Sequence, residues 1–207
     1  MNEYLEFKKL LEQIKESGKR PKLLLHSCCG PCSSYVLNML KDYFDITIFY
    51  YNPNIYPSEE FNKRLNVQKE LIRKMNINIE VIECVEPYDV YLNAVNGYTD
   101  LKEGSIRCYK CYEFRIKKLS EYASANGFDY FSTVMSVSPY KSSKWINELG
   151  FTYQDKSIFL YSNFKKENGY KESIKLSKEY DLYRQDWCGC EFSLNEHQEA
   201  LSKKDNM

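Results

Sequence analysis

The chain has 207 residues, enough for one substantial domain, and Lys plus Arg balance Asp plus Glu at 29 each. This balance excludes a global basic field, so any nucleic acid must be held by a local patch. The N-terminal residues are charged and amphipathic, and no apolar run approaches membrane-spanning length, so we expect a cytoplasmic protein with no membrane partner.

The first half of the chain alternates helical and strand patterns. Apolar residues at helical spacing predict a leading helix over 3–17, within a leading segment 1–20. A short apolar run at 22–25 predicts a buried strand, which a cysteine-rich turn joins to a helix over 35–43. β-branched and aromatic residues predict a second strand over 46–52, and a loop with two prolines then enters a helix that ends near residue 75.

The second half continues the alternation. We expect a third strand over 77–85, helices around 88–96 and over 111–125, and a fourth strand over 128–134. A helix over 163–180 and a short helix in the tail 194–207 complete the chain. Strands separated by helices imply a parallel sheet, so the sequence predicts a single α/β domain whose functional part spans 21–193.

Eight cysteines in a reducing compartment are not expected to form structural disulfides, and clustered thiols there indicate metal or redox chemistry. Cys84 stands alone in the apolar-rich third strand, where we expect a buried small hydrophobic residue. The other seven fall into three short groups. One structural zinc ion uses only four sulfurs, so seven disfavour a purely structural site.

The first group, Cys28, Cys29 and Cys32, follows the first predicted strand in the motif HSCCGPC. Ligands of open parallel sheets bind beyond the carboxyl ends of the strands, and the next helix directs its positive N-terminal end at this turn. That position also favours the thiolate that binds metal. Three core thiols in five residues at such a turn are a poor alternative.

The other two groups are pairs. Cys108 and Cys111 have a spacing that lets both sulfurs face one ion or cluster, although alone they could be an incidental pair at a helix start. Cys188 and Cys190 are too close for the usual zinc pair, and a disulfide between them would close a small, strained ring that is readily reduced. This spacing suits electron or thiol exchange.

Motifs of other chemistries are weak or absent. The sequence has no GxxxxGK[ST] and no GxGxxG, and its two histidines do not complete a Ser-His-Asp set. His26 could equally anchor the cysteine turn or transfer protons. Lys141 lies after the fourth predicted strand, on the side of the sheet where we expect the active site. A second group of lysines forms one face of the helix predicted over 163–180, flanked by Arg184. Such a face is typical of a solvated surface, and contact with phosphate is the alternative.

Four stretches together resemble one family: HSCCGPCS, RCYKCYEFR, FSTVMSVSPYKSSKWINELG and NGYKESIKLSKEYDLYRQDWCGCEFS. They are similar to the cobalamin-independent epoxyqueuosine reductases, formerly a domain of unknown function, over about 26–193. The resemblance implies a Rossmann-like (HUP-like) parallel sheet with cysteine-rich loops at the carboxyl ends of the strands. It also implies the last step of queuosine biosynthesis, in which the epoxide of epoxyqueuosine is reduced to a cyclopentene with release of water. The substrate would be epoxyqueuosine at the wobble position of tRNA with a GUN anticodon. The electrons would come from a donor that the sequence does not identify.

Residue roles follow from the resemblance. The 4Fe-4S ligands would be Cys28, Cys29, Cys108 and Cys111, and Cys188 with Cys190 would form a redox-active pair. Cys32 would hold a second ion, iron or zinc, because some relatives have aspartate at this position and both thiolate and carboxylate bind these metals.

The remaining site residues are assigned more broadly. Removing the epoxide oxygen needs two electrons and two protons, and His26, Tyr140 and Asp186 are candidate proton donors. Lys141, Arg184 and Tyr140 are expected to bind substrate, with the two basic residues contacting the anticodon backbone.

Two other functions compete with this interpretation. An ATP-using tRNA sulfur-transferase would share the sheet and the cysteines, but it needs a glycine- and serine-rich pyrophosphate loop where this chain has HSCCGPC. A zinc-stabilised RNA-binding module would bind stoichiometric zinc and be colourless. An iron-sulfur protein would be brown with broad absorption at about 400 nm.

Overall fold

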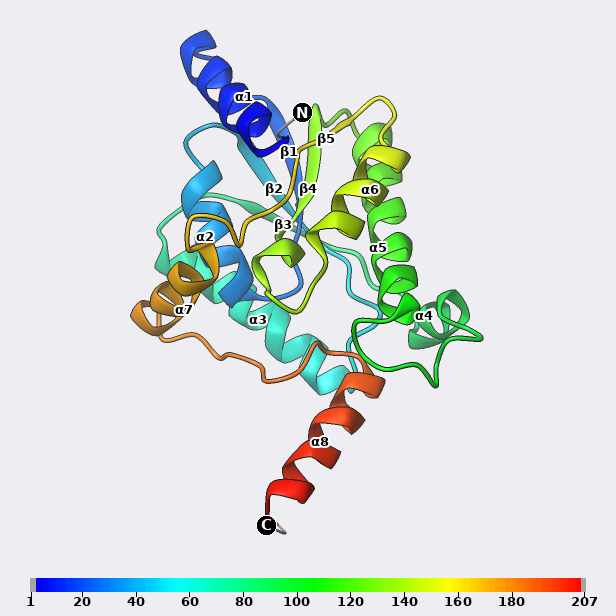
Figure 1. Cartoon of the computed structure of the whole chain (residues 1–207). Coiled ribbons are helices and arrows are strands. Elements are labelled where there is room, and N and C mark those ends of the chain that lie inside the picture. Colours follow the sequence, from blue (N-terminus) through cyan, green and yellow to red (C-terminus); the bar gives the residue numbers. More distant parts are fainter. Residues whose placement is uncertain (1–2, 206–207) are drawn as a thin grey trace.

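A computed structural model describes residues 3–205 and contains one five-stranded parallel sheet (Figure 1). The strand order is β3-β2-β1-β4-β5, so β1 lies at the centre, between β2 and β4. The strands are β1 (Lys22–His26), β2 (Asp45–Tyr50), β3 (Glu80–Glu83), β4 (Tyr130–Thr133) and β5 (Ile158–Phe159). The predicted α/β fold with a parallel sheet is confirmed.

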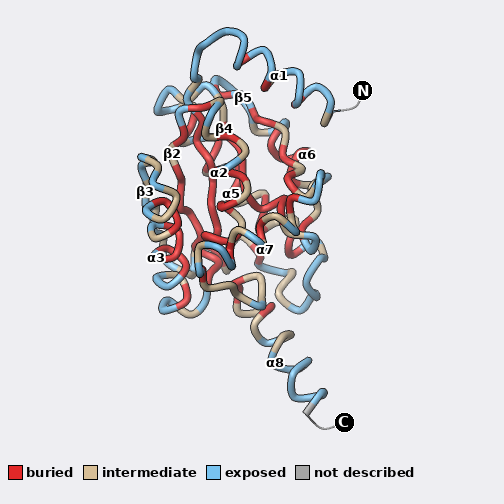
Figure 2. The backbone as a smooth tube through the Cα atoms, turned by 90° about the vertical axis from the view of Figure 1, so that its left-hand side faces the viewer, coloured by how far each residue is buried: buried red, intermediate tan, exposed pale blue. Residues whose placement is uncertain are grey.

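Helices cover both faces of the sheet. They are α1 (Glu3–Ser17), α2 (Gly30–Leu40), α3 (Ser58–Lys74), α4 (Tyr88–Ala94), α5 (Ile106–Ala125), α6 (Ser143–Tyr153), α7 (Gly169–Glu179) and α8 (Glu191–Asp205), with a short 3-10 helix at Val134–Val137. Helix α2 packs against α3 and α7, whereas α5 packs against α6, and Figure 1 shows the sheet between α2 and α5. The C-terminal part of α8 extends away from the rest of the molecule (Figures 1 and 2).

The central strand explains the position of the core. Leu23, Leu24 and Leu25 are fully buried, because β1 is covered by helices on both faces (Figure 2). This apolar run is the pattern that predicts a buried strand, and β1 begins at the predicted residue. The loop that follows it is therefore fixed at the carboxyl edge of the sheet.

Several element boundaries differ from the predictions. The predicted helix over 163–180 is shorter and begins at Gly169, since Glu167 and Asn168 have positive φ angles of 51° and 65° that a helix does not accept. Helices α2 and α5 begin earlier than predicted, at Gly30 and Ile106, so Cys32 and Cys108 are helical. Helix α6 and the two-residue strand β5 were not predicted.

Within residues 3–205, no helix combines the length and the apolar character required to span a lipid bilayer.

Candidate active site

Cys28, Cys29 and Cys32 converge where β1 passes into α2. Their sulfur atoms all lie within 4.8 Å of one another, and Cys28 Sγ is 4.0 Å from Cys29 Sγ. Gly30 makes this tight turn feasible, because a Cβ atom there would lie 2.8 Å from Val67 Cγ1 and 2.9 Å from the Val67 carbonyl oxygen. The three sulfurs therefore form one compact donor group, as the first motif predicts.

A cavity of about 250 Å³ opens beside these sulfurs, and we call it the thiol pocket. Its lining is Cys28, Cys32, Glu103, Ser138, Tyr140, Lys141, Tyr170, Ser173, Arg184, Gln185, Asp186, Trp187 and Cys188. Seven of these residues were singled out from the sequence. A larger cavity of about 530 Å³, lined by Tyr56, Phe61 and Tyr88 among others, contains no cysteine, so we place the chemistry in the thiol pocket.

Cys108 and Cys111 lie one turn apart on α5, and both are buried. The backbone N–H of Gly104 donates to Cys108 Sγ at 3.3 Å, while Cys111 belongs to a small apolar cluster that includes Cys190. Burial raises the pKa of Cys108 to about 11 and that of Cys111 to about 12. A metal that binds these sulfurs would therefore have to displace their protons.

The two cysteines of the third group face different surroundings. Cys188 is half-buried and lines the thiol pocket, whereas Cys190 is buried against Tyr91, Val95 and Cys111. Gly189 allows this reversal because its φ angle is 124°, a conformation that other residues rarely adopt. Both thiols are free, and of the two only Cys188 belongs to the pocket lining.

Two cations are buried among the thiols. Lys141 is 8% exposed and Arg115 is 2% exposed, and in the described part of the chain neither pairs with a carboxylate. Burial alone lowers the pKa of Lys141, but attraction to the negative charge that nearby groups carry when ionised, Cys188 and Cys28 foremost, outweighs it and holds that pKa well above its usual value. The pKa of Arg115 is raised in the same way, against the effect of burial, by Cys111, Cys188 and Cys28.

The segment that precedes Cys188 supplies polar groups to the pocket. Gln185 Nε2 donates to Cys29 Sγ at 3.0 Å, and Arg184 Nη1 donates to Ser177 Oγ at 3.1 Å. Asp186 is exposed, and Tyr140, which also lines the pocket, is 76% exposed. Gln185 and Arg115 were missed in the sequence, although Gln185 belongs to the YRQ stretch that carries the resemblance.

His26 lies outside the thiol pocket. Its Nδ1 is 2.8 Å from Thr133 Oγ1, its Nε2 is 3.1 Å from the Tyr51 carbonyl oxygen, and the residue is 1% exposed. Burial lowers the pKa of His26 to about 4, so the ring is neutral near pH 7. These contacts favour the anchoring alternative over proton transfer.

Cys84, expected to be buried, is half-buried and lies directly after β3, and it does not line the thiol pocket.

Together, the sheet and the thiol pocket define a Rossmann-like α/β protein with a cysteine-based site at the carboxyl edge of the strands. The family model described as "Epoxyqueuosine reductase QueH" matches residues 23–196. The chain is 40% identical to the Staphylococcus aureus epoxyqueuosine reductase QueH, over 90% of this chain and 81% of the relative. It is 39% identical to the Staphylococcus epidermidis protein of the same name, over 90% of this chain and 82% of the relative. The chain therefore belongs to the epoxyqueuosine reductase QueH family.

A solved structure shares the fold at low sequence identity. The U34-tRNA thiolase NcsA from Methanococcus maripaludis, solved with its 4Fe-4S cluster, superimposes with a TM-score of 0.51 and 13% identity. The match covers 92% of this chain and 68% of that chain. This likeness shows a common sheet architecture, while the family is assigned by the sequence relatives.

Proposed function

We propose that this chain reduces epoxyqueuosine to queuosine at the wobble position of tRNA with a GUN anticodon. The observation that carries the proposal is the thiol pocket, which combines a compact sulfur donor group, a free thiol and a buried cation at one edge of the sheet. Membership of the QueH family supports the reductase over the sulfur-transferase and the RNA-binding module.

The cysteines suit an iron-sulfur site. We assign a 4Fe-4S cluster to Cys28, Cys29, Cys108 and Cys111, and a second iron or zinc ion to Cys32. Thiolates are the ligands that iron-sulfur clusters use, and the sulfurs of Cys28, Cys29 and Cys32 lie within 4.8 Å of one another at the edge of the sheet. When bound, the cluster would supply electrons one at a time.

Cys188 and Cys190 provide the two-electron reductant in this proposal. Oxidation of the two thiols to a disulfide releases two electrons and two protons. Cleavage of both C–O bonds of the epoxide, with formation of a C=C bond and one water molecule, consumes the same number. An external electron donor then returns the disulfide to two thiols. Cys188 lines the pocket and would face the substrate, while Cys190, in the neighbouring apolar cluster, would complete the disulfide with it.

Lys141 would act inside the pocket. Its ammonium group is nearly inaccessible from bulk solvent, so we assign it to the substrate group that enters the pocket and not, as the sequence suggested, to the RNA backbone. A fixed cation in a poorly hydrated site stabilises negative charge that develops on oxygen as a C–O bond breaks. Asp186 and Tyr140 remain the proposed proton donors, and Arg184 and Tyr140 the proposed substrate contacts at the pocket lining.

The test is to replace Cys188 and Cys190 singly by serine. We expect each variant to keep its iron and visible spectrum but to lose conversion of epoxyqueuosine in tRNA, because one thiol cannot form the intramolecular disulfide. Iron content, spectrum and conversion are measured on the same anaerobic preparation, with Cys84→Ser as the matched control. Loss of iron in both variants would show that these cysteines are ligands, and an active, iron-replete variant would show that the pair is dispensable.

A further inference from the structure

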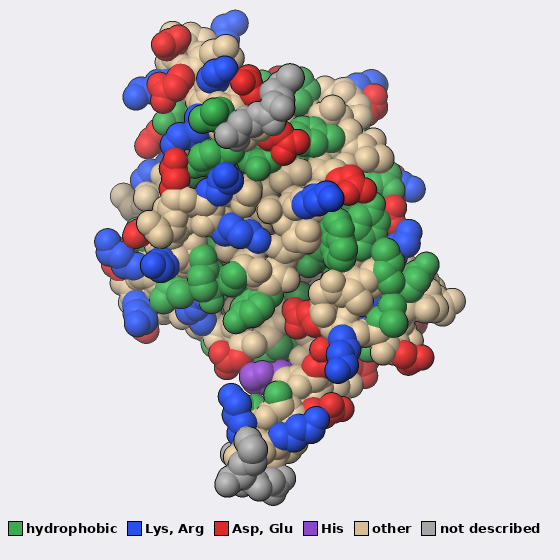
Figure 3. Space-filling view, in the orientation of Figure 1, with side chains coloured by type: hydrophobic (Ala, Val, Ile, Leu, Met, Phe, Trp, Pro, Cys, Tyr) green, Lys and Arg blue, Asp and Glu red, His purple; other side chains and the backbone are tan. Residues whose placement is uncertain are grey.

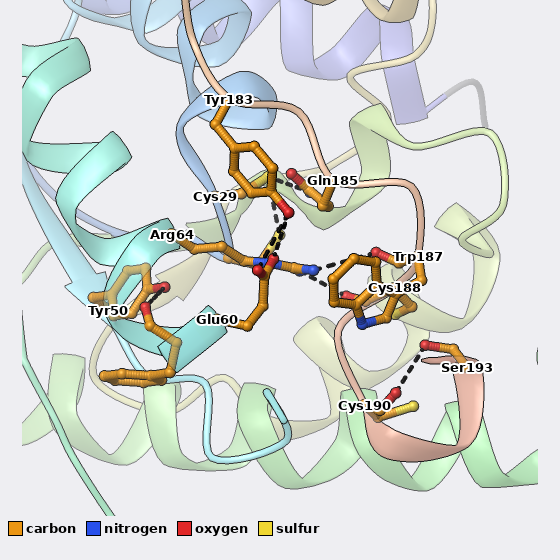
Figure 4. A network of polar contacts seen from close by, with 12 residues as sticks. Cys29, Tyr50, Glu60, Arg64, Tyr183, Gln185, Trp187, Cys188, Cys190 and Ser193 are labelled. Carbon is orange, nitrogen blue, oxygen red and sulfur yellow. Dashed lines mark hydrogen bonds and ion pairs between the residues drawn. The ribbon is translucent and has the colours of Figure 1, made fainter. Parts of the chain in front are cut away.

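Arg64, on α3, reaches the redox segment from inside the protein. The residue is 1% exposed, and its Nη1 donates to the Cys188 carbonyl oxygen at 3.0 Å while Nη2 donates to that of Trp187 at 3.4 Å (Figure 4). The guanidinium carbon also lies 5.3 Å from the centroid of the Trp187 ring. One buried side chain therefore holds two consecutive carbonyl groups directly before Gly189.

The carbonyl of Gly189 is held as well. The backbone N–H of Tyr56 donates to it at 2.8 Å, so three consecutive carbonyl groups accept hydrogen bonds from donors far away in the sequence. Gly189 also lies against Arg64, because a Cβ atom at this position would come 2.8 Å from Arg64 Nη1 and would force the guanidinium group to shift. The turn that directs Cys188 and Cys190 to different sides is thus built around the guanidinium group.

Glu60 fixes Arg64 and links it to the start of the same segment. Arg64 Nε donates to Glu60 Oε1 at 2.5 Å, and the Tyr183 hydroxyl donates to both Glu60 carboxylate oxygens at 3.2 Å. Between these two anchor points, Gln185 donates to Cys29 Sγ. Figure 4 shows Arg64 and Glu60 between Tyr183 and Trp187, so this ion pair connects both ends of the 183–188 segment.

The chemistry of this ion pair argues against a purely stabilising role. A buried ion pair contributes little net stability because removing both charges from water costs much of what their attraction returns. The planar fork of arginine can donate to a carboxylate and to two carbonyls at the same time, and lysine cannot reproduce that geometry.

We propose that Arg64 is a positioning residue that sets the exposure and pairing of Cys188 and Cys190 by fixing the backbone on both sides of Cys188. The consequence for turnover rests on the proposed redox role of this pair. The geometric consequence does not, because a released segment would expose Cys188 whatever its chemical role.

The experiment compares Arg64→Lys with Arg73→Lys, a matched change at an exposed arginine on the same helix. Alkylation by iodoacetamide is followed for each cysteine by mass spectrometry in the purified protein, with Cys84 as the internal reference. We expect the Cys188 rate, relative to that of Cys84, to rise about tenfold in Arg64→Lys, as the loss of one or two hydrogen bonds from a charged donor predicts. Arg73→Lys should change the ratio by less than about twofold.

A second variant guards against misfolding of the first. Tyr183→Phe removes one hydroxyl from Glu60 and leaves the ion pair, so we expect a smaller increase, about threefold, in the same ratio. An unchanged ratio in both variants would overturn the proposal. If both rates rose equally, the cause would be general loosening of the protein, and if neither rose, Arg64 would have no effect on the exposure of Cys188. The Cys188–Cys190 disulfide fraction in a glutathione buffer and the kcat for epoxyqueuosine are measured in parallel. A wild-type chain that does not reduce epoxyqueuosine would refute the proposed function while leaving the alkylation result to decide the role of Arg64.

Discussion

Lys141 and Arg115 are buried cations whose neighbouring opposite charges are sulfurs and not carboxylates. An uncompensated buried cation is costly, and a deprotonated thiol nearby reduces that cost. The two cations therefore favour the thiolate form, which is the form that binds metal. Burial acts in the opposite direction and raises the pKa of Cys108 and Cys111. A bound metal and these cations would therefore together keep the two thiols deprotonated.

Single cysteine replacements test the ligand assignment. We expect the alanine variants of Cys28, Cys29, Cys108 and Cys111 each to lose cluster iron, because removal of one thiolate opens the cluster to solvent. Iron and sulfide are quantified after anaerobic reconstitution, together with absorption at about 400 nm.

Cys84→Ala is the control for these variants. Cys84 is half-buried after β3 and does not line the thiol pocket, so its replacement should retain full iron. Full iron and sulfide in all four test variants would mean that the cluster ligands have been assigned incorrectly.

At the scale of the elements, most helices and strands with a local pattern were predicted, but α6 was missed although it has 11 residues and begins at a serine N-cap. The apolar run of β1 and the cysteine turn after it lie where the sequence indicated, and this placement alone locates the first sulfur group. Strand β5 has only two residues, which is too short for a periodic pattern, and α7 begins late because of a backbone reversal at Asn168. Arg64 could not be found, because it contacts a carbonyl 124 positions away.

The start of α7 gives a prediction at this scale. Gly169 lies against the preceding loop so closely that a Cβ atom would come 1.9 Å from the Phe164 carbonyl oxygen and 2.5 Å from Tyr35 Cε1. We expect Gly169→Ala to reduce the free energy of unfolding by about 2 kcal/mol, since backbone must move to admit the methyl group. Chemical denaturation measures this, with the exposed Lys171→Ala on the same helix as control. Equal stability of the two variants would mean that the loop shifts without cost.

Over the whole molecule, a formal net charge of zero conceals a local excess of lysine. Lys171, Lys175 and Lys178 are exposed on α7, the helix that contributes Tyr170 and Ser173 to the thiol pocket. In Figure 3, Lys and Arg side chains gather on the side where Figure 1 places α7. Because Lys141 is buried, these exposed lysines are the better candidates for contacts with the RNA backbone.

This distribution predicts that tRNA binding depends on salt concentration and that the exposed lysines of α7 provide the phosphate contacts. Replacing Lys171, Lys175 and Lys178 together by alanine should weaken tRNA binding and reduce the slope of log affinity against log salt by about 2, at roughly 0.7 for each lost phosphate contact. Binding is measured at several salt concentrations on iron-replete protein. The matched control replaces Lys9, Lys15 and Lys19, which are exposed on and just after α1, a helix that contributes nothing to the thiol pocket lining. An equal reduction in slope for both triple variants would indicate a general charge effect, and no reduction for the α7 variant would move the RNA contact to another surface.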